Sequence, residues 1–177
     1  MRASVLPKRY LNLEWLGMLF TLLMGTLLHF AYKLSGYSGF AALFCATSES
    51  TWEHMKLLFF PYVLYAILEY VFIPCKKYVP NYITAKGCGV VSGLITIPLL
   101  FYGYTTVLGK NHLVIDIAIF ICSVVLSYGI SYLLLNHPAI NFNGLFLTIL
   151  VVLAMFFGLF TFFPPSDALF TPPSASG

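Results

Sequence analysis

The chain has 177 residues, of which 60% are hydrophobic and only 8% are charged, and its mean hydropathy is +0.90. A soluble domain carries roughly 25% charged residues, so there is too little charge here to cover a water-facing surface. The net charge of +3 comes from scattered Lys and Arg residues rather than from a basic stripe, which excludes nucleic acid as an expected partner.

Five apolar segments are long enough to cross a bilayer, which takes about 20 residues of helix. They cover residues 11–32, 52–73, 82–108, 113–135 and 142–163. Prolines and glycines between them, such as Pro74 and Gly109, favour loops. We therefore expect an all-α integral membrane bundle of about five transmembrane helices. It forms a single domain over residues 1–165, followed by a short Pro-rich tail over residues 166–177.

Two further features concern packing within this bundle. Residues 36–47 are apolar but too short to span, which predicts a re-entrant or interfacial segment before the second helix. Gly89, Gly93 and Gly103 lie in the third apolar segment. Small residues let transmembrane helices approach closely, so we expect these glycines to face neighbouring helices.

The distribution of Lys and Arg predicts the orientation, because cytoplasmic loops carry an excess of them. If every segment spans, six basic residues lie on one side of the membrane and three on the other. These are Arg2, Lys8, Arg9, Lys76, Lys77 and Lys86 against Lys33, Lys56 and Lys110. The sequence thus predicts a multi-pass protein of the cell membrane with a cytoplasmic N-terminus. Membrane lipids are its expected partners, and a homo-oligomer is an open alternative.

The densest group of charged residues opens the second helix and contains Glu49, Glu53, His54 and Lys56. At about 100° per residue, Glu49, Glu53 and Lys56 share one helix face. An ionisable group at the bilayer centre costs at least ~2.5 kcal/mol, so all four are candidate catalytic residues. The structural alternative is a capping box between Ser50 and Glu53, with an ion pair between Glu53 and Lys56.

A metal site is a second hypothesis for the same end of the bundle. His29, near the end of the first helix, and Asp116, at the start of the fourth, fall at the level of Glu53 and His54. Imidazoles and carboxylates are ordinary zinc ligands, so these four residues are candidates to hold a divalent metal. No fixed-spacing metal motif accompanies them, and each residue alone also fits a hydrogen-bonded position at the membrane interface.

Glu69 stands apart from this group, because the 16 residues that separate it from Glu53 correspond to roughly 24 Å of helix. Candidate partners at its own level are Glu14, Lys76 and His137. The simpler interpretation is an ion pair that joins the first two helices. The alternative is a relay of protons or cations between the two sides of the membrane.

The stretch SESTWEHMKLLFFP, residues 48–61, resembles the signature Asn-Glu-Ser-x-Trp-Glu-His-x-Lys-Leu of a bacterial family of small multi-pass membrane proteins of unknown function. The ending FFPPSDALFTPP is similar to the Pro-Pro-x-x-x-Leu-Phe terminus of that family. Ser48 stands where Asn is usual, and Ser166 stands where a His often follows the double proline. The resemblance implies membrane class and a role for residues 49–56, and it implies no reaction.

Three functions follow as hypotheses. The first is a metal-assisted enzyme that acts on a lipid or small substrate at the outer mouth of the bundle, although no nucleophile motif accompanies it. The second is an oligomeric transporter of protons, cations or small molecules. The third is a non-catalytic membrane component that binds a partner or a lipid. The sequence leaves open whether the protein is an enzyme.

Overall fold

The computed structural model describes residues 8–73, 79–137 and 139–173 of the chain. Several residues used in the sequence analysis lie outside the described residues. These are Arg2, the side chains of Lys8 and Arg9, Pro74, Lys76, Lys77 and the last four residues of the tail.

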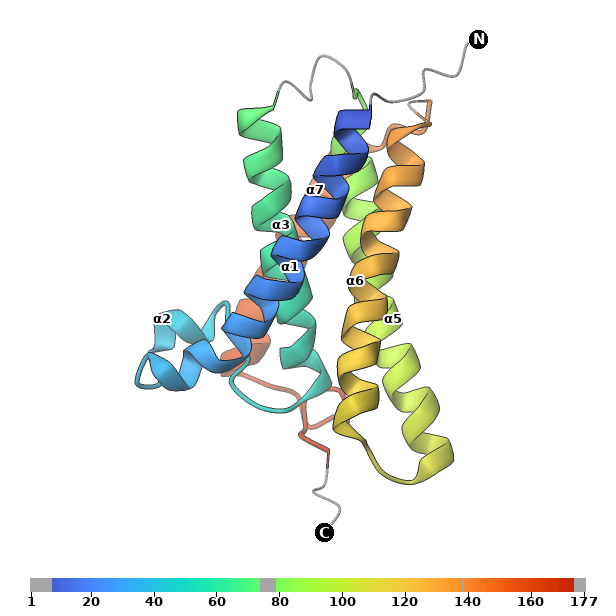
Figure 1. Cartoon of the computed structure of the whole chain (residues 1–177). Coiled ribbons are helices and arrows are strands. Elements are labelled where there is room, and N and C mark those ends of the chain that lie inside the picture. Colours follow the sequence, from blue (N-terminus) through green and yellow to red (C-terminus); the bar gives the residue numbers. More distant parts are fainter. Residues whose placement is uncertain (1–7, 74–78, 138, 174–177) are drawn as a thin grey trace.

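All regular secondary structure in the described part of the chain is helical (Figure 1). Its elements are α1 (Lys8–Leu34), α2 (Gly39–Ala42), α3 (Thr51–Phe72), α5 (Tyr82–Leu108), α6 (Leu113–Leu135) and α7 (Asn143–Phe162). All of these except α2 are long and apolar enough to span a membrane, which makes five. The prediction of an all-α bundle with about five spans is confirmed.

The five long helices run alternately in opposite directions, so their ends gather at two ends of the bundle (Figure 1). We call one the Glu14 end, where α1, α5 and α7 begin and α3 and α6 finish. At the other, the Glu53 end, α3 and α6 begin and α1, α5 and α7 finish. The described residues of the C-terminal tail, up to residue 173, lie at the Glu53 end. Successive spans therefore place the start of α3 and the end of α1 at one level.

Helices α5 and α6 form the most extensive helix–helix contact. Small residues let their backbones approach closely. A Cβ atom added at Gly89 would lie 2.5 Å from the carbonyl oxygen of Ser127, and one at Gly93 would lie 2.9 Å from that of Ser123. Both positions therefore need glycine, as predicted. The same prediction is wrong for Gly103, because nothing lies within 4 Å of a Cβ added there.

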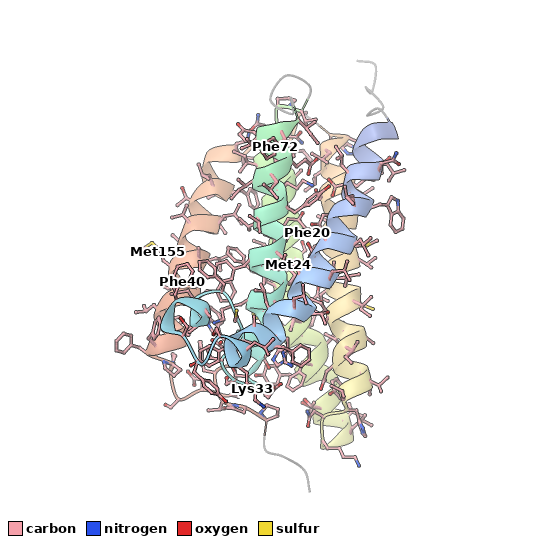
Figure 2. All side chains as sticks on the ribbon, turned by 60° about the vertical axis from the view of Figure 1, so that its left-hand side comes forward. Phe20, Met24, Lys33, Phe40, Phe72 and Met155 are labelled. Atoms are coloured by element: carbon pink, nitrogen blue, oxygen red, sulfur yellow. The ribbon has the colours of Figure 1, made fainter. Side chains whose placement is uncertain are left out.

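The segment before α3 does not span. Gly36 and Tyr37 both have positive φ angles, of 69° and 63°, and turn the chain away from α1 into the single-turn helix α2. Figure 2 shows Phe40 of this segment at the same end of the bundle as Lys33 and opposite Phe72. The chain then returns to the axis of the bundle at the start of α3, which positions the candidate site.

The tail beyond α7 folds back against the start of α3. The backbone N–H of Trp52 donates to the carbonyl oxygen of Leu169 at 3.0 Å. The Phe170 ring packs against the rings of Trp52 and Phe160, with centroids 5.1 and 5.2 Å apart. One of the free N–H groups at the first turn of α3 is thereby satisfied by the tail.

Candidate functional site

The first turn of α3 is capped by Ser50, whose hydroxyl accepts the backbone N–H of Glu53 at 3.3 Å. The second half of the expected capping box is not formed. The N–H of Ser50 donates to the hydroxyl of Ser48 at 3.3 Å, and the Glu53 side chain turns toward the bundle interior. Ser50 alone is therefore enough to begin the helix, and the Glu53 carboxylate is available for other contacts.

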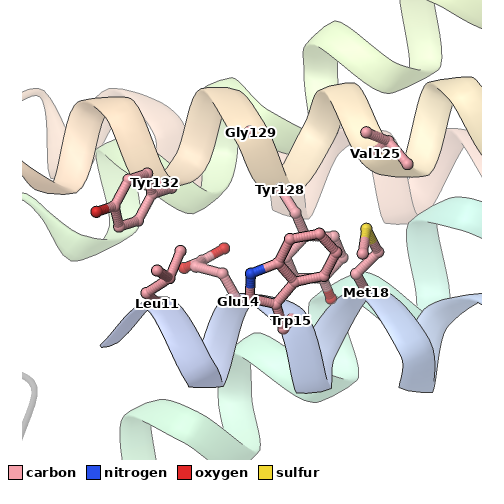
Figure 3. A pocket seen from close by; sticks show the side chains of 8 residues that line it. All are labelled: Leu11, Glu14, Trp15, Met18, Val125, Tyr128, Gly129 and Tyr132. Atoms are coloured by element: carbon pink, nitrogen blue, oxygen red, sulfur yellow. The ribbon is translucent and has the colours of Figure 1, made fainter. Parts of the chain in front are cut away.

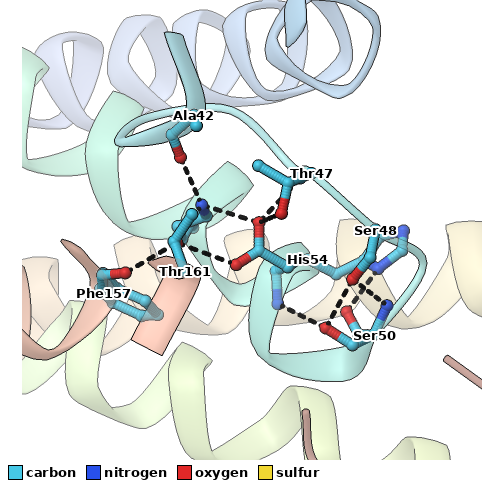
Figure 4. Close-up of polar contacts among 9 residues, drawn as sticks. Ala42, Thr47, Ser48, Ser50, His54, Phe157 and Thr161 are labelled. Atoms are coloured by element: carbon cyan, nitrogen blue, oxygen red, sulfur yellow. Dashed lines mark hydrogen bonds and ion pairs between the residues drawn. The ribbon is translucent and has the colours of Figure 1, made fainter. Parts of the chain in front are cut away.

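That carboxylate is the centre of a buried network (Figure 4). Its Oε2 accepts the Lys56 ammonium at 2.7 Å and both the N–H and the hydroxyl of Thr47, at 2.7 and 2.9 Å. Its Oε1 accepts the hydroxyl of Thr161 at 3.0 Å. The ammonium of Lys56 also donates to Thr161 and to the carbonyl oxygen of Ala42, each at 2.8 Å.

This Glu53–Lys56 network connects three parts of the chain: the segment after α2, the start of α3 and the end of α7. Lys56 is 0% exposed and Glu53 is 4% exposed. The ammonium has three partners for its three N–H groups, and both carboxylate oxygens accept hydrogen bonds. Because a buried ion pair needs such complete satisfaction to be stable, the geometry favours a structural role for these two residues.

Beside the network lies a second group, the His29–Glu49–His54 cluster. His29 comes from α1, Glu49 from the turn before α3, and His54 from the first turns of α3. The Glu49 carboxylate lies 3.9 Å from Nε2 of His29 and 3.4 Å from Nε2 of His54. One ligand atom from each of the three residues lies within 4.8 Å of the other two. Three such side chains at this separation could hold a metal ion.

A hydrogen bond orients His54 within this cluster. Nδ1 of His54 lies 2.9 Å from the carbonyl oxygen of Ser50, and because a carbonyl only accepts, this nitrogen carries a proton. Nε2 of His54 is then the atom directed at Glu49, where it either shares a second proton or offers a lone pair to a metal. Such a second partner is the usual way in which a ligating His is oriented. The hydrogen bond from the His54 side chain lowers the pKa of Glu49, so the carboxylate is held in its charged form.

The predicted metal ligands are only partly brought together. His29 and His54 meet, but their carboxylate neighbour is Glu49, which we predicted as a catalytic residue rather than a ligand. Glu53 is occupied by Lys56 and the two threonines of its network. The Asp116 carboxylate accepts the hydroxyl of Tyr104 and lies 3.5 Å from the amide nitrogen of Asn111. Asp116 therefore fixes the connection between α5 and α6.

At the Glu14 end, Lys86 of α5 links two carboxylates. Its Nζ lies 2.6 Å from Oε1 of Glu14 and 2.8 Å from Oε2 of Glu69, and the three side chains are almost completely buried. Tyr82 donates its hydroxyl to the same oxygen of Glu69 at 3.0 Å. We expected Glu14 near Glu69 but missed Lys86, which we had counted only as a basic residue near a loop. Its position within an apolar run was the signal.

The fold and these sites define the class: an all-α bundle with five helices that are long enough to span a membrane and with charged groups buried near both ends. The chain belongs to a family of unknown function, DUF6512, whose model matches residues 5–176. This match covers nearly the whole chain. No curated protein and no solved structure matches it.

Proposed function

We propose that the protein is an integral membrane protein that holds a divalent metal ion, with zinc as the best chemical fit, in the His29–Glu49–His54 cluster. The metal would act on a lipid or small substrate at the membrane surface. The observation that carries the proposal is the approach of three potential ligand atoms, from α1, α3 and the turn between them, to within 4.8 Å of one another.

The distances suit zinc. With metal–ligand bonds of about 2.0–2.2 Å, two ligands of a tetrahedral zinc ion lie roughly 3.4 Å apart. Nε2 of His54 lies 3.4 Å from Oε2 of Glu49, and Nε2 of His29 lies 3.9 Å from Oε1. The three ligand atoms lie within 4.8 Å of one another, so the side chains would have to move closer together by up to about 1.4 Å to bind zinc. Two histidines and a carboxylate leave a fourth position for water, as catalytic zinc sites do. A metal-bound water has a lowered pKa and becomes a nucleophile near neutral pH.

The position of the cluster supports a substrate from the membrane surface. Its side chains are 29%, 35% and 69% exposed for His29, His54 and Glu49, so water and a headgroup have access. The Lys and Arg distribution predicts a cytoplasmic N-terminus, which would leave this end outside the cell. The stretch similar to the bacterial family signature includes both Glu49 and His54, which agrees with a site built on that stretch.

The test is the zinc content of the purified protein. After dialysis against zinc, we expect about one ion per chain, as the single cluster implies, and loss of that ion in His54→Ala and Glu49→Ala. His112→Ala is a matched control, because His112 lies at the same end of the bundle, just before α6, but outside the cluster. A correctly folded protein that stays free of zinc, or a His54→Ala variant that binds zinc as the wild type does, would contradict the proposal.

A second candidate, an oligomeric transporter of protons or cations, is favoured by the buried charges at both ends of one bundle. Ionisable groups inside membrane spans mark ion pathways in many transporters, and Glu69 and Lys86 are such groups. Here we expect proton or cation flux into liposomes that is abolished by Glu69→Gln. Absence of flux under every imposed gradient rules this candidate out.

A further inference from the structure

A cavity of about 220 Å³ lies between α1 and α6 (Figure 3). It is at the Glu14 end, opposite the end of the bundle that holds the His29–Glu49–His54 cluster. Residues that line it include Leu11, Glu14, Trp15, Tyr128, Gly129 and Tyr132. Its rim faces outward, because Trp15 is 61% exposed on helices that are otherwise suited to contact lipid. A molecule can therefore enter the cavity sideways from the bilayer.

One carboxylate lies within this mostly apolar lining, that of Glu14. Figure 3 shows it extending from α1 toward α6. Its Oε1 accepts from Lys86 at 2.6 Å and from the hydroxyl of Ser131 at 3.3 Å. Its Oε2 is buried and has no hydrogen-bond partner among the described residues. A buried oxygen without a donor costs free energy, so the site has a place for one more donor.

The charges around Glu14 indicate what kind of donor fits. Among the described residues, the carboxylates of Glu14 and Glu69 both contact the ammonium of Lys86. Aromatic rings attract cations over their faces. The rings of Trp15 and Tyr132 line the cavity, as does that of Tyr128, over which the Lys86 ammonium already lies at 5.5 Å. A carboxylate with aromatic neighbours is suited to an ammonium group, and the apolar remainder of the lining is suited to a hydrocarbon chain.

We propose that this cavity binds a lipophilic amine, with its ammonium group at Oε2 of Glu14 and its hydrocarbon chain directed into the bilayer. The oxygen is buried in the present structure, so binding requires a side chain of the lining to move. Trp15 is the lining side chain that loses least packing when it moves, because it is 61% exposed. The site does not depend on the metal, since its residues lie at the other end of the bundle.

The probe is dodecylamine, compared with dodecanol, which has the same chain and no charge. Binding is measured by native mass spectrometry of the detergent-solubilised full-length protein. A charge-assisted hydrogen bond contributes about 1.5–3 kcal/mol, so we expect one amine per chain, bound about ten- to a hundredfold more tightly than the alcohol. Glu14→Gln should reduce this preference to about onefold, because the amide keeps the shape and removes the charge.

A second variant tests the cavity without touching the carboxylate. Nothing lies within 4 Å of a Cβ added at Gly129 or at Gly103, so both accept a larger side chain, but only Gly129 lines the cavity. Gly129→Leu should abolish amine binding, and Gly103→Leu should leave it unchanged. Equal affinity for amine and alcohol, or full amine binding by a folded Gly129→Leu variant, would overturn the inference.

Discussion

The Glu53–Lys56 network and the His29–Glu49–His54 cluster lie side by side at the start of α3, yet they differ in how completely their polar atoms are used. In the network, the Lys56 ammonium and both Glu53 oxygens have hydrogen-bond partners and are buried. In the cluster, two imidazoles approach one partly exposed carboxylate. A dense group of charged residues in such a sequence therefore contains both structural residues and candidate ligand-binding residues. The hydrogen-bond partners of each residue distinguish the two kinds.

The largest expected effect comes from breaking the network. Lys56→Met leaves the Glu53 carboxylate buried without its cation, which typically costs about 3–5 kcal/mol. Denaturant unfolding in detergent measures this loss. Lys110→Met, in an exposed connection between α5 and α6, is the control and should change the free energy of unfolding by less than about 0.5 kcal/mol. Equal stability of the two variants contradicts a structural role for the network.

For the His29–Glu49–His54 cluster, we expect the free energy of unfolding to change with added zinc rather than with substitution alone. A ligand that binds only the folded state stabilises it by about 2.7 kcal/mol at a hundredfold excess over Kd, so zinc should raise the unfolding free energy of the wild-type protein by that amount. His29→Ala should lose the gain, and Lys56→Met should retain it if that variant still folds. A gain that survives in His29→Ala would place the zinc elsewhere.

A smaller effect is expected at Ser50, which serves both groups through different atoms. Its hydroxyl caps α3, and its carbonyl oxygen orients His54. Ser50→Ala removes only the hydroxyl, so we expect a loss of about 1 kcal/mol in unfolding free energy with zinc affinity unchanged. Calorimetric zinc titration of the folded variant measures the second part. A large fall in zinc affinity would show that the cap and the cluster are coupled.

The smallest expected effect is the pH dependence of the stability of the metal-free protein. The pKa of Glu49 is lowered in the folded state by the His54 side chain, so its contribution to stability is present above its unfolded pKa. The contribution is lost as the pH falls through the lower folded value. Because Glu49 is 69% exposed, we expect at most about 0.5 kcal/mol. The stability difference between wild type and Glu49→Gln, measured by unfolding, should shrink from pH 7 to pH 3; a constant difference contradicts this.

The sequence was sufficient for the spans, because the length and continuity of apolar segments alone determine them. Residues 52–73 were expected for a helix observed at Thr51–Phe72, and 142–163 for one at Asn143–Phe162. The apolar segment before α3 was also recognised as too short to span. These features depend on local composition, which one sequence contains in full.

The sequence predicted the region of the candidate site but not which of its side chains contact one another. We placed Glu49 and Glu53 on one helix face, but α3 begins at Thr51, so Glu49 lies in a turn whose direction helical periodicity does not predict. The carboxylate that meets the histidines is therefore Glu49. Two other contacts depend on how distant segments pack, and no local sequence pattern predicts them. These are the contact of Lys56 with the carbonyl of Ala42 and that of Lys86 with Glu14.

The most direct test of the central claim is the zinc K-edge X-ray absorption spectrum of the zinc-loaded protein. The account predicts a first shell of nitrogen and oxygen at about 2.0–2.1 Å, with outer-shell scattering from two imidazoles. A shell of oxygen alone, or a spectrum with sulfur ligands, would contradict a metal centre built from His29, Glu49 and His54.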